Sequence, residues 1–141
     1  MNANVNDKLH TGMTYLRGIS PAVAGSDDTA YVSQIIDTKN YKNVEFVMLT
    51  GSLADANATF AVLVEEGDAS NLSDAAAVAD ADLNGTEAAA GFTFAADNTI
   101  EKIGYRGLKR YVRLTVTPSG NTGDVYLACI VVCEPGDLLP V

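Results

Sequence analysis

Hydrophobic and polar residues alternate with a period of two along several short stretches of this chain. The clearest stretch is residues 111–117, in which Val112, Leu114 and Val116 share one face. A period of two is typical of a strand with one buried face and one solvated face. A Pro-Ser-Gly-Asn turn follows directly, and such residues end strands. We therefore expect a strand here with its apolar side in a core.

Further stretches of this kind predict the rest of the fold. The expected strands cover residues 31–36, 44–49, 60–64, 88–94, 100–105, 111–117 and 125–133. Short connections favour antiparallel pairing, so the sequence predicts an all-β, single-domain antiparallel β-sandwich, jelly-roll-like, of seven or eight strands. The last stretch is apolar on both faces, so we expect a central strand that is covered on both sides.

Three segments are expected along the chain. Residues 1–30 are polar and contain several glycines, which predicts an extended N-terminal arm that orders against a partner. A frayed terminus plus one edge strand is the alternative. Residues 31–134 form the expected sandwich domain. Residues 135–141 form a C-terminal tail, whose leucines dock onto a partner or fold back onto their own domain.

Residues 70–83 are the one helical candidate. Leucine and alanine recur there at helix-like spacing, and Asn71 or Ser73 could cap the first turn. The segment is also short and rich in aspartate. An ordered Ω-like loop with one helical turn is therefore an equal alternative.

The sequence offers no catalytic constellation. Its one histidine, His10, lies in the polar arm, whereas a nucleophilic triad needs a histidine on a rigid framework. Cys129 and Cys133 are four residues apart in a predicted strand, which separates them by roughly 13 Å and excludes a disulfide. We interpret them as buried free thiols. The chain is therefore predicted to be no enzyme and to carry no cofactor.

The aspartates of residues 68–84 are the best candidates for a metal site. Asp74, Asp80 and Asp82 would supply the hard oxygen ligands that Ca²⁺ prefers. Counted from Asp80, however, the twelfth loop position is Gly91, where an EF-hand needs a glutamate. Aspartates also suit turns and helix starts. No metal site is predicted, although a calcium ion would be sought in this loop.

The charge distribution bears on partners. The formal net charge is −9, which argues against binding to nucleic acid or to an anionic membrane. Five of the nine basic residues nevertheless lie in one short stretch: Lys102, Arg106, Lys109, Arg110 and Arg113. These charges are either simply solvated, or they meet an acidic surface on a neighbouring subunit or another partner.

Several segments of residues 31–133 carry a family resemblance: 33–38, 50–60, 62–68, 78–86 and 109–114. They resemble small proteins encoded among the head-assembly genes of tailed bacteriophages and prophages. The resemblance implies a protein of the virion, made in the bacterial host cytoplasm. Small β-sandwich proteins of this kind often decorate the capsid, so it also implies the major capsid protein and further copies of the chain, as a dimer or trimer, as partners.

The expected function is therefore a capsid decoration (cement) protein that stabilises the shell by non-covalent contacts. A neck, head-completion or tail-tube protein is the alternative, and a surface carbohydrate-binding module is a further one. The absence of Trp and an aromatic content of 7% weaken the last. The candidate partner contacts are Leu9, Met13, Tyr15, Leu16, Arg106, Lys109, Arg110, Arg113, Leu138 and Leu139.

Overall fold

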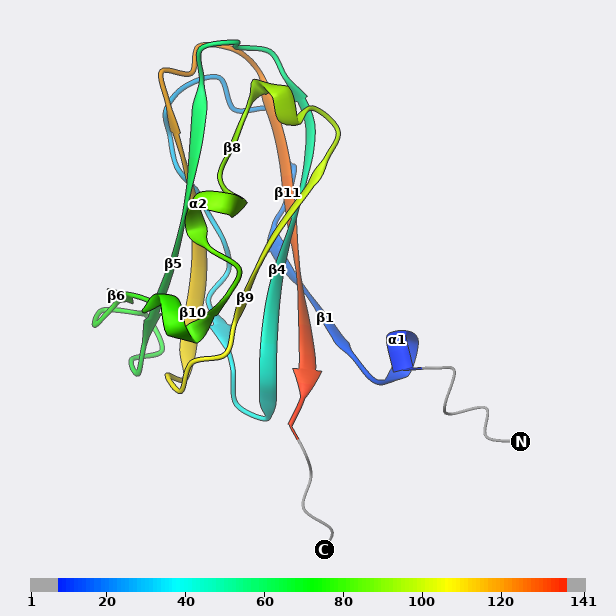
Figure 1. The fold of residues 1–141 in the computed structure, drawn as a ribbon, viewed down its shortest axis with the longest axis vertical. Coiled ribbons are helices and arrows are strands. Elements are labelled where there is room, and N and C mark those ends of the chain that lie inside the picture. The colour runs from blue at the N-terminus through cyan, green and yellow to red at the C-terminus, as the bar shows by residue number, and fades with distance from the viewer. Residues whose placement is uncertain (1–7, 137–141) are drawn as a thin grey trace, which may run out of the picture.

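The computed structural model describes residues 8–136, and these form two antiparallel sheets packed face to face (Figure 1). The longer strands among them are β1 (Thr14–Ile19), β4 (Tyr41–Leu53), β5 (Thr59–Gly67), β9 (Ile100–Tyr105), β10 (Tyr111–Ser119) and β11 (Val125–Pro135). The two-residue strands are β2 (Tyr31–Val32), β3 (Ile36–Asp37), β6 (Ala76–Ala77), β7 (Leu83–Asn84) and β8 (Phe92–Thr93). Short helical turns are α1 (Lys8–Thr11), α2 (Glu87–Ala90), η2 (Asp80–Asp82) and η3 (Phe94–Ala96).

The order of the strands confirms the predicted antiparallel β-sandwich. Sheet A has the order β1-β11-β4-β9-β7. Sheet B has the order β2-β10-β5-β6, with β3 paired to β10 and β8 paired to β5. The chain passes from one sheet to the other between β4 and β5, between β9 and β10, and again between β10 and β11. Each sheet is therefore built from segments that are distant in sequence.

The core lies between the sheets and follows the predicted alternation. Val112, Leu114 and Val116 of β10 are fully buried. On sheet A, Phe46 and Met48 of β4 are buried in the same core. Intervening residues of both strands are partly or fully exposed. The period of two therefore positions one apolar face of each sheet against the other.

The expected strand at residues 31–36 is broken into β2 and β3 by Ser33. This residue is buried, and its backbone N–H donates to the carbonyl of Leu114 at 2.8 Å. Its Oγ in turn accepts from the Leu114 N–H at 2.9 Å. The serine side chain thus replaces one ladder bond, which interrupts the regular pairing with β10.

Residues 70–83 form a loop rather than an α-helix, in agreement with the second of the two alternatives. Leu72 has a left-handed φ of 53°, which a helix does not allow. The Asp74 carboxylate accepts hydrogen bonds from the N–H groups of Asp68 and Ala69, at 2.8 and 3.2 Å. Only η2 is helical in this segment. Local side chain–backbone bonds have therefore outweighed the helical spacing.

The strand expected at residues 88–94 is confirmed only at Phe92–Thr93, which form β8, and is wrong for the residues before them. Residues Glu87–Ala90 form α2, because the Thr86 hydroxyl accepts from the Ala89 N–H as an N-cap. Glu87 also accepts from the Val64 N–H of β5, at 2.7 Å. Extended pairing begins only at β8. The N-cap of α2 therefore determines the structure of these residues, in place of the strand that the apolar pattern favours.

Residues 14–19, inside the segment expected to form an arm, are the edge strand of sheet A. β1 pairs with β11 from Thr14 opposite Cys133 to Ile19 opposite Cys129. Gly25 adds an isolated bridge to Val125. α1 precedes this strand and projects from the side of the sandwich (Figure 1).

Candidate functional site

No metal centre is found among residues 8–136: no three His, Cys, Asp or Glu side chains lie together there. Cys129 and Cys133 are buried and free, as predicted. Burial raises the pKa of the Cys129 thiol to about 12 and that of Cys133 to about 11. Thiolates are the nucleophilic form of cysteine, so both side chains act as small hydrophobic groups at neutral pH.

None of the helices within the described residues is long and apolar enough to cross a membrane.

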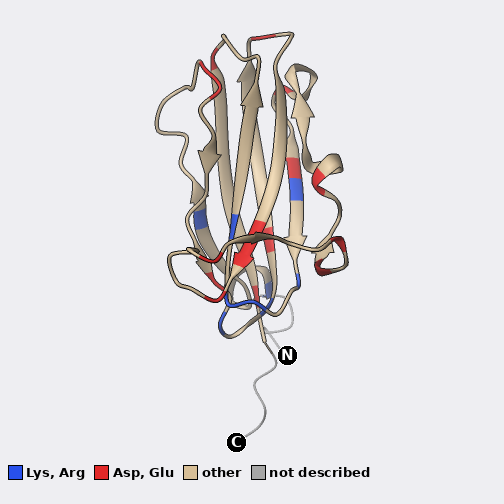
Figure 2. Ribbon diagram, turned by 90° about the vertical axis from the view of Figure 1, so that its left-hand side faces the viewer, with Lys and Arg blue, Asp and Glu red and all other residues tan. Residues whose placement is uncertain are grey.

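The predicted basic contacts lie together near one end of the sandwich, where acidic side chains also gather (Figure 2). Each of these cations has a partner within the chain. The partners are Asp68 for Lys109, Asp37 for Arg110 (2.9 Å), Glu65 for Arg113 (3.0 Å) and the carbonyl of Ala81 for Arg106 Nε (3.1 Å). The opposite charges recognised in the sequence therefore meet within one molecule.

One of these ion pairs, between Arg110 and Asp37, is bidentate. The guanidinium donates two hydrogen bonds to the carboxylate, at 3.1 and 2.9 Å. These bonds hold the pKa of Asp37 below its usual value. Both side chains are nearly half exposed, and exposed pairs contribute only about 0.2–1 kcal/mol.

Replacing Arg110 by alanine is therefore expected to change the free energy of unfolding by less than about 1 kcal/mol. Urea denaturation of Arg110→Ala beside the wild type would measure this. Arg113→Ala is the comparison, because its pair with Glu65 is less exposed. A loss of several kcal/mol from Arg110→Ala alone would show that this pair is a structural element and would contradict the estimate.

The other predicted contacts lie on different elements, α1 and β1 at the edge of sheet A. Leu9 is exposed in α1, and Tyr15 is half exposed in β1. Met13 lies between them and is partly buried, whereas Leu16 packs against the core. Leu138 and Leu139 lie outside the described residues. The structure thus brings the arm residues to sheet A and the basic residues to one end.

One exposed apolar surface was not predicted: it is the outer face of sheet A. The double cover expected for the last strand is wrong for the described residues, because Ile130 of β11 is 51% exposed. Leu49 of β4 is 53% exposed and Ile100 of β9 is 62% exposed. Tyr126 of β11 and Tyr15 of β1 are exposed to a similar degree. The sandwich has two layers, so no third layer covers the second apolar side of β11.

Strand register joins these residues into one continuous patch. Ala128 pairs with Leu49, which pairs with Ile100; Ile130 pairs with Val47. Directly paired residues share one face of a sheet. We call this patch the apolar face and define it by Tyr15, Val47, Leu49, Ile100, Tyr126, Ala128, Ile130 and Val132.

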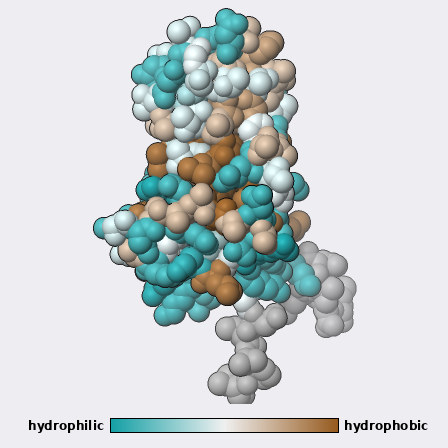
Figure 3. Space-filling view, turned by 60° about the vertical axis from the view of Figure 1, so that its left-hand side comes forward, coloured by the Kyte–Doolittle hydropathy of each residue, from teal (hydrophilic) through white to brown (hydrophobic). Residues whose placement is uncertain are grey.

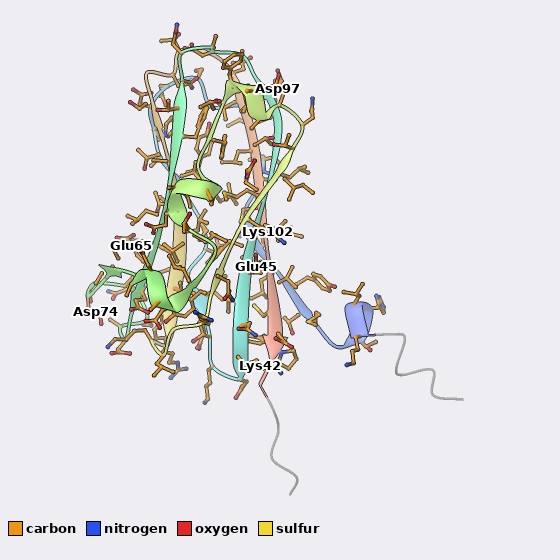
Figure 4. The ribbon with its side chains drawn as sticks, in the orientation of Figure 1. Lys42, Glu45, Glu65, Asp74, Asp97 and Lys102 are labelled. Atoms are coloured by element: carbon orange, nitrogen blue, oxygen red, sulfur yellow. The ribbon has the colours of Figure 1, made fainter. Side chains whose placement is uncertain are left out.

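Charged groups of both signs border the apolar face. Arg17 pairs with Ile130, Lys102 pairs with Val47, and Glu45 pairs with both Val132 and Gly104. The Glu45 carboxylate lies over Gly104, where a side chain would collide with it. Burial raises the pKa of Glu45 above its ordinary value, and the positive charge of Lys102 offsets part of this rise. Figure 4 shows these two labelled residues on neighbouring strands.

α1 borders the apolar face at the β1 edge. Tyr15 pairs with Val132 and so lies on this face. Its hydroxyl donates to the carbonyl of Leu9, which ties the helical turn to this side of the sheet. Leu9, which is 75% exposed, is therefore the nearest exposed apolar residue of α1 to this edge of the sheet.

A second apolar feature is a hollow of about 390 Å³ that lies along β5, beside β8 and α2. On the face that Figure 3 shows, hydrophobic side chains gather at mid-height among hydrophilic ones. Phe60 and Phe92 line the hollow with their rings stacked at 4.8 Å, and Glu87 and Ala88 of α2 lie beside them. Both rings are almost fully buried. The hollow therefore presents no exposed ring for stacking on a sugar.

No protein-family model matches the chain, and no curated protein matches it. Solved structures with a similar fold include the CBM22-1 and GH10 modules of Clostridium thermocellum endo-1,4-β-D-xylanase 10B, complexed with xylohexaose. The identity is 12% and the TM-score is 0.43 over 92% of this chain, which spans only 27% of that one.

Two shorter proteins are similar over nearly their whole length. The SPBc2 prophage-derived protein YomS has 12% identity and a TM-score of 0.42, over 85% of this chain and 92% of its own. The CBM22-1 xylan-binding domain of Paenibacillus barcinonensis Xyn10C has 11% identity and a TM-score of 0.44, over 91% and 89%. Likeness at this level concerns the sandwich alone, and no residue role is carried over from these proteins.

Proposed function

We propose that this chain is a non-catalytic structural protein of a phage virion that decorates the capsid shell by binding the major capsid protein. The observation that supports it best is the apolar face, which the described residues leave uncovered across four strands of sheet A. Contiguous exposed apolar patches mark surfaces through which proteins assemble, with further copies of the same chain or with another protein. The resemblance to head-region proteins suggests where such a protein assembles.

The basic end is the candidate contact with the shell. Lys109 and Arg110 keep about half of their side-chain surface exposed, although each is paired within the chain. Such groups remain able to share their hydrogen bonds with acidic groups of a partner. The arm and the tail residues Leu138 and Leu139 are the other proposed contacts.

Adding the purified chain to shells that lack it is expected to give saturable binding and to raise the temperature at which the particles release DNA. Cross-boundary contacts stabilise the assembled state because the protein binds that state alone. Heat-release curves and co-sedimentation would measure both effects. Unchanged release temperatures at saturating protein would contradict the cement role.

Two variants test the contact surface. Arg110→Glu replaces a positive charge by a negative one at the basic end, whereas Thr117→Glu adds one negative charge at an exposed position of β10. We expect only Arg110→Glu to weaken shell binding. A cryo-EM map of the decorated particle would separate the alternatives, because density at the portal vertex or in the tail identifies a neck or tail-tube protein. A glycan array with specific binding would instead support the carbohydrate-binding alternative.

A further inference from the structure

We infer that the apolar face is covered by a second copy of this chain, so that two copies pack sheet A against sheet A around a two-fold axis. The inference rests on the proposed function, because it describes the unit that would bind the shell. It assigns the apolar face to self-association and leaves the basic end free for the shell.

The local charge of the apolar face allows two copies to meet there. The chain has a net charge of −9, and most acidic positions lie toward the two ends of the sandwich (Figure 2). Within the three cross-strand rows of the apolar face the charged groups are Arg17, Lys102 and Glu45. This surface is therefore free of the excess negative charge, and two copies approach through it without strong repulsion.

The apolar face also suits a contact between two identical surfaces. A two-fold interface joins the same patch on both copies, and an apolar sheet face is complementary to itself. Sheet-on-sheet packing at about 10 Å is already how this chain forms its own core. The side chains of Ile130, Leu49 and Ile100 would then fill the space between two facing sheets, as Phe46 and Met48 do inside the sandwich.

The area of the apolar face can be compared with the area that a stable interface buries. Four strands spaced by about 4.8 Å, over about six residues of length, give a footprint of roughly 400 Å². A stable interface buries about 800 Å² on each partner. Part of the remainder has a source at the same edge, because Leu9 of α1 is 75% exposed and its carbonyl accepts a hydrogen bond from Tyr15 of β1. α1 of each copy would therefore contact the other.

The test is the oligomeric state of the purified full chain without shells. Sedimentation velocity and light scattering over a micromolar concentration series are expected to show a dimer. Ile130→Asp should weaken it by about 100-fold or more, since the dimer would lose the apolar contact of Ile130 and bury a carboxylate in its place, with only Arg17 of the same copy beside it. The matched control is Leu63→Asp, which makes the same change on the exposed side of β5 in sheet B and should leave the dimer intact.

A second measurement covers the case in which Ile130→Asp fails to fold. If two copies associate only when folded, the melting temperature of the wild type must rise with protein concentration. Ile100→Asp, at the more exposed margin of the face, should remove that dependence.

A wild type that stays monomeric, with a melting temperature independent of concentration, would overturn the inference. So would a dimer that survives both Ile130→Asp and Ile100→Asp. Shell binding is measured separately. Monomers that still bind shells, and lose binding with Ile130→Asp, would assign the apolar face to the capsid protein and leave the proposed function standing. Dimers that bind no shell would leave the dimer standing and contradict the proposed function.

Discussion

Phe46→Ala is expected to lower the free energy of unfolding by about 3–5 kcal/mol. Phe46 has no exposed surface and lies at the centre of β4, opposite Val131 of β11 and Ile103 of β9. Removing its ring deletes contacts to both neighbouring strands and leaves a cavity that two rigid sheets cannot close. Domains of this size are stable by about 5–15 kcal/mol, so the loss is a large share of the total.

Urea denaturation at neutral pH would measure the effect, with equal m-values as the check that both proteins unfold in the same way. Phe94→Ala is the matched control, because Phe94 in η3 is 44% exposed and its removal should cost less than about 1 kcal/mol. Equal losses from the two substitutions would show that the described core does not carry the stability of the fold.

The core could be predicted because its signal is local. Val112, Leu114 and Val116 alternate with polar residues, and all three are fully buried. Residues 100–105 were likewise predicted as a strand and form β9. Side chains on a strand alternate between two faces whatever its partners, so the pattern needs no knowledge of the rest of the chain.

Prediction failed where a local hydrogen bond competes with the pattern. At residues 88–94 the apolar pattern favours a strand, yet the Thr86 hydroxyl caps α2. At residues 70–83 the sequence left a helix and a loop open, and Asp74 selects the loop by accepting from the N–H groups of Asp68 and Ala69. One bond of this kind contributes about 1 kcal/mol, which exceeds the differences in propensity that separate a short strand from a turn.

The apolar face was missed for a different reason. Residues 125–133 are apolar on both sides. The sequence alone does not show whether the second side is covered by the chain's own fold or left at the surface. Whether Ile130 meets a third layer or open surface depends on the number of layers, and only the tertiary structure shows two. The same two-sided apolar pattern, once the sandwich is known, identifies the surface that we propose a second copy covers.

Raising the pH from 8 to 10.5 is expected to destabilise the folded chain by about 4 kcal/mol through its two cysteines. Their thiols are buried in sheet A, and burial raises the pKa of Cys129 to about 12 and of Cys133 to about 11, from an ordinary value of 9.0. At pH values between 9 and the raised pKa values, the unfolded chain loses its thiol protons while the folded chain keeps them.

The sign follows from the number of bound protons. When the folded state binds more protons than the unfolded state, stability falls as the pH rises. The stabilisation is therefore complete below about pH 9 and is lost progressively up to the folded pKa values. Each thiol contributes about 2 kcal/mol of the loss at pH 10.5, since one pKa unit corresponds to about 1.4 kcal/mol. Tyr105, whose pKa burial also raises, adds to the loss above pH 10.

Urea denaturation across pH 8 to 10.5 would measure this dependence. The double variant Cys129→Ala/Cys133→Ala is expected to be less stable at pH 8, because it leaves small cavities, yet to have a much weaker dependence on pH. A thiol reagent provides an independent check, since the folded wild type should react only as fast as it opens. Equal pH dependence in both proteins, or rapid labelling of the native chain at pH 8, would show that these cysteines are not buried as neutral thiols.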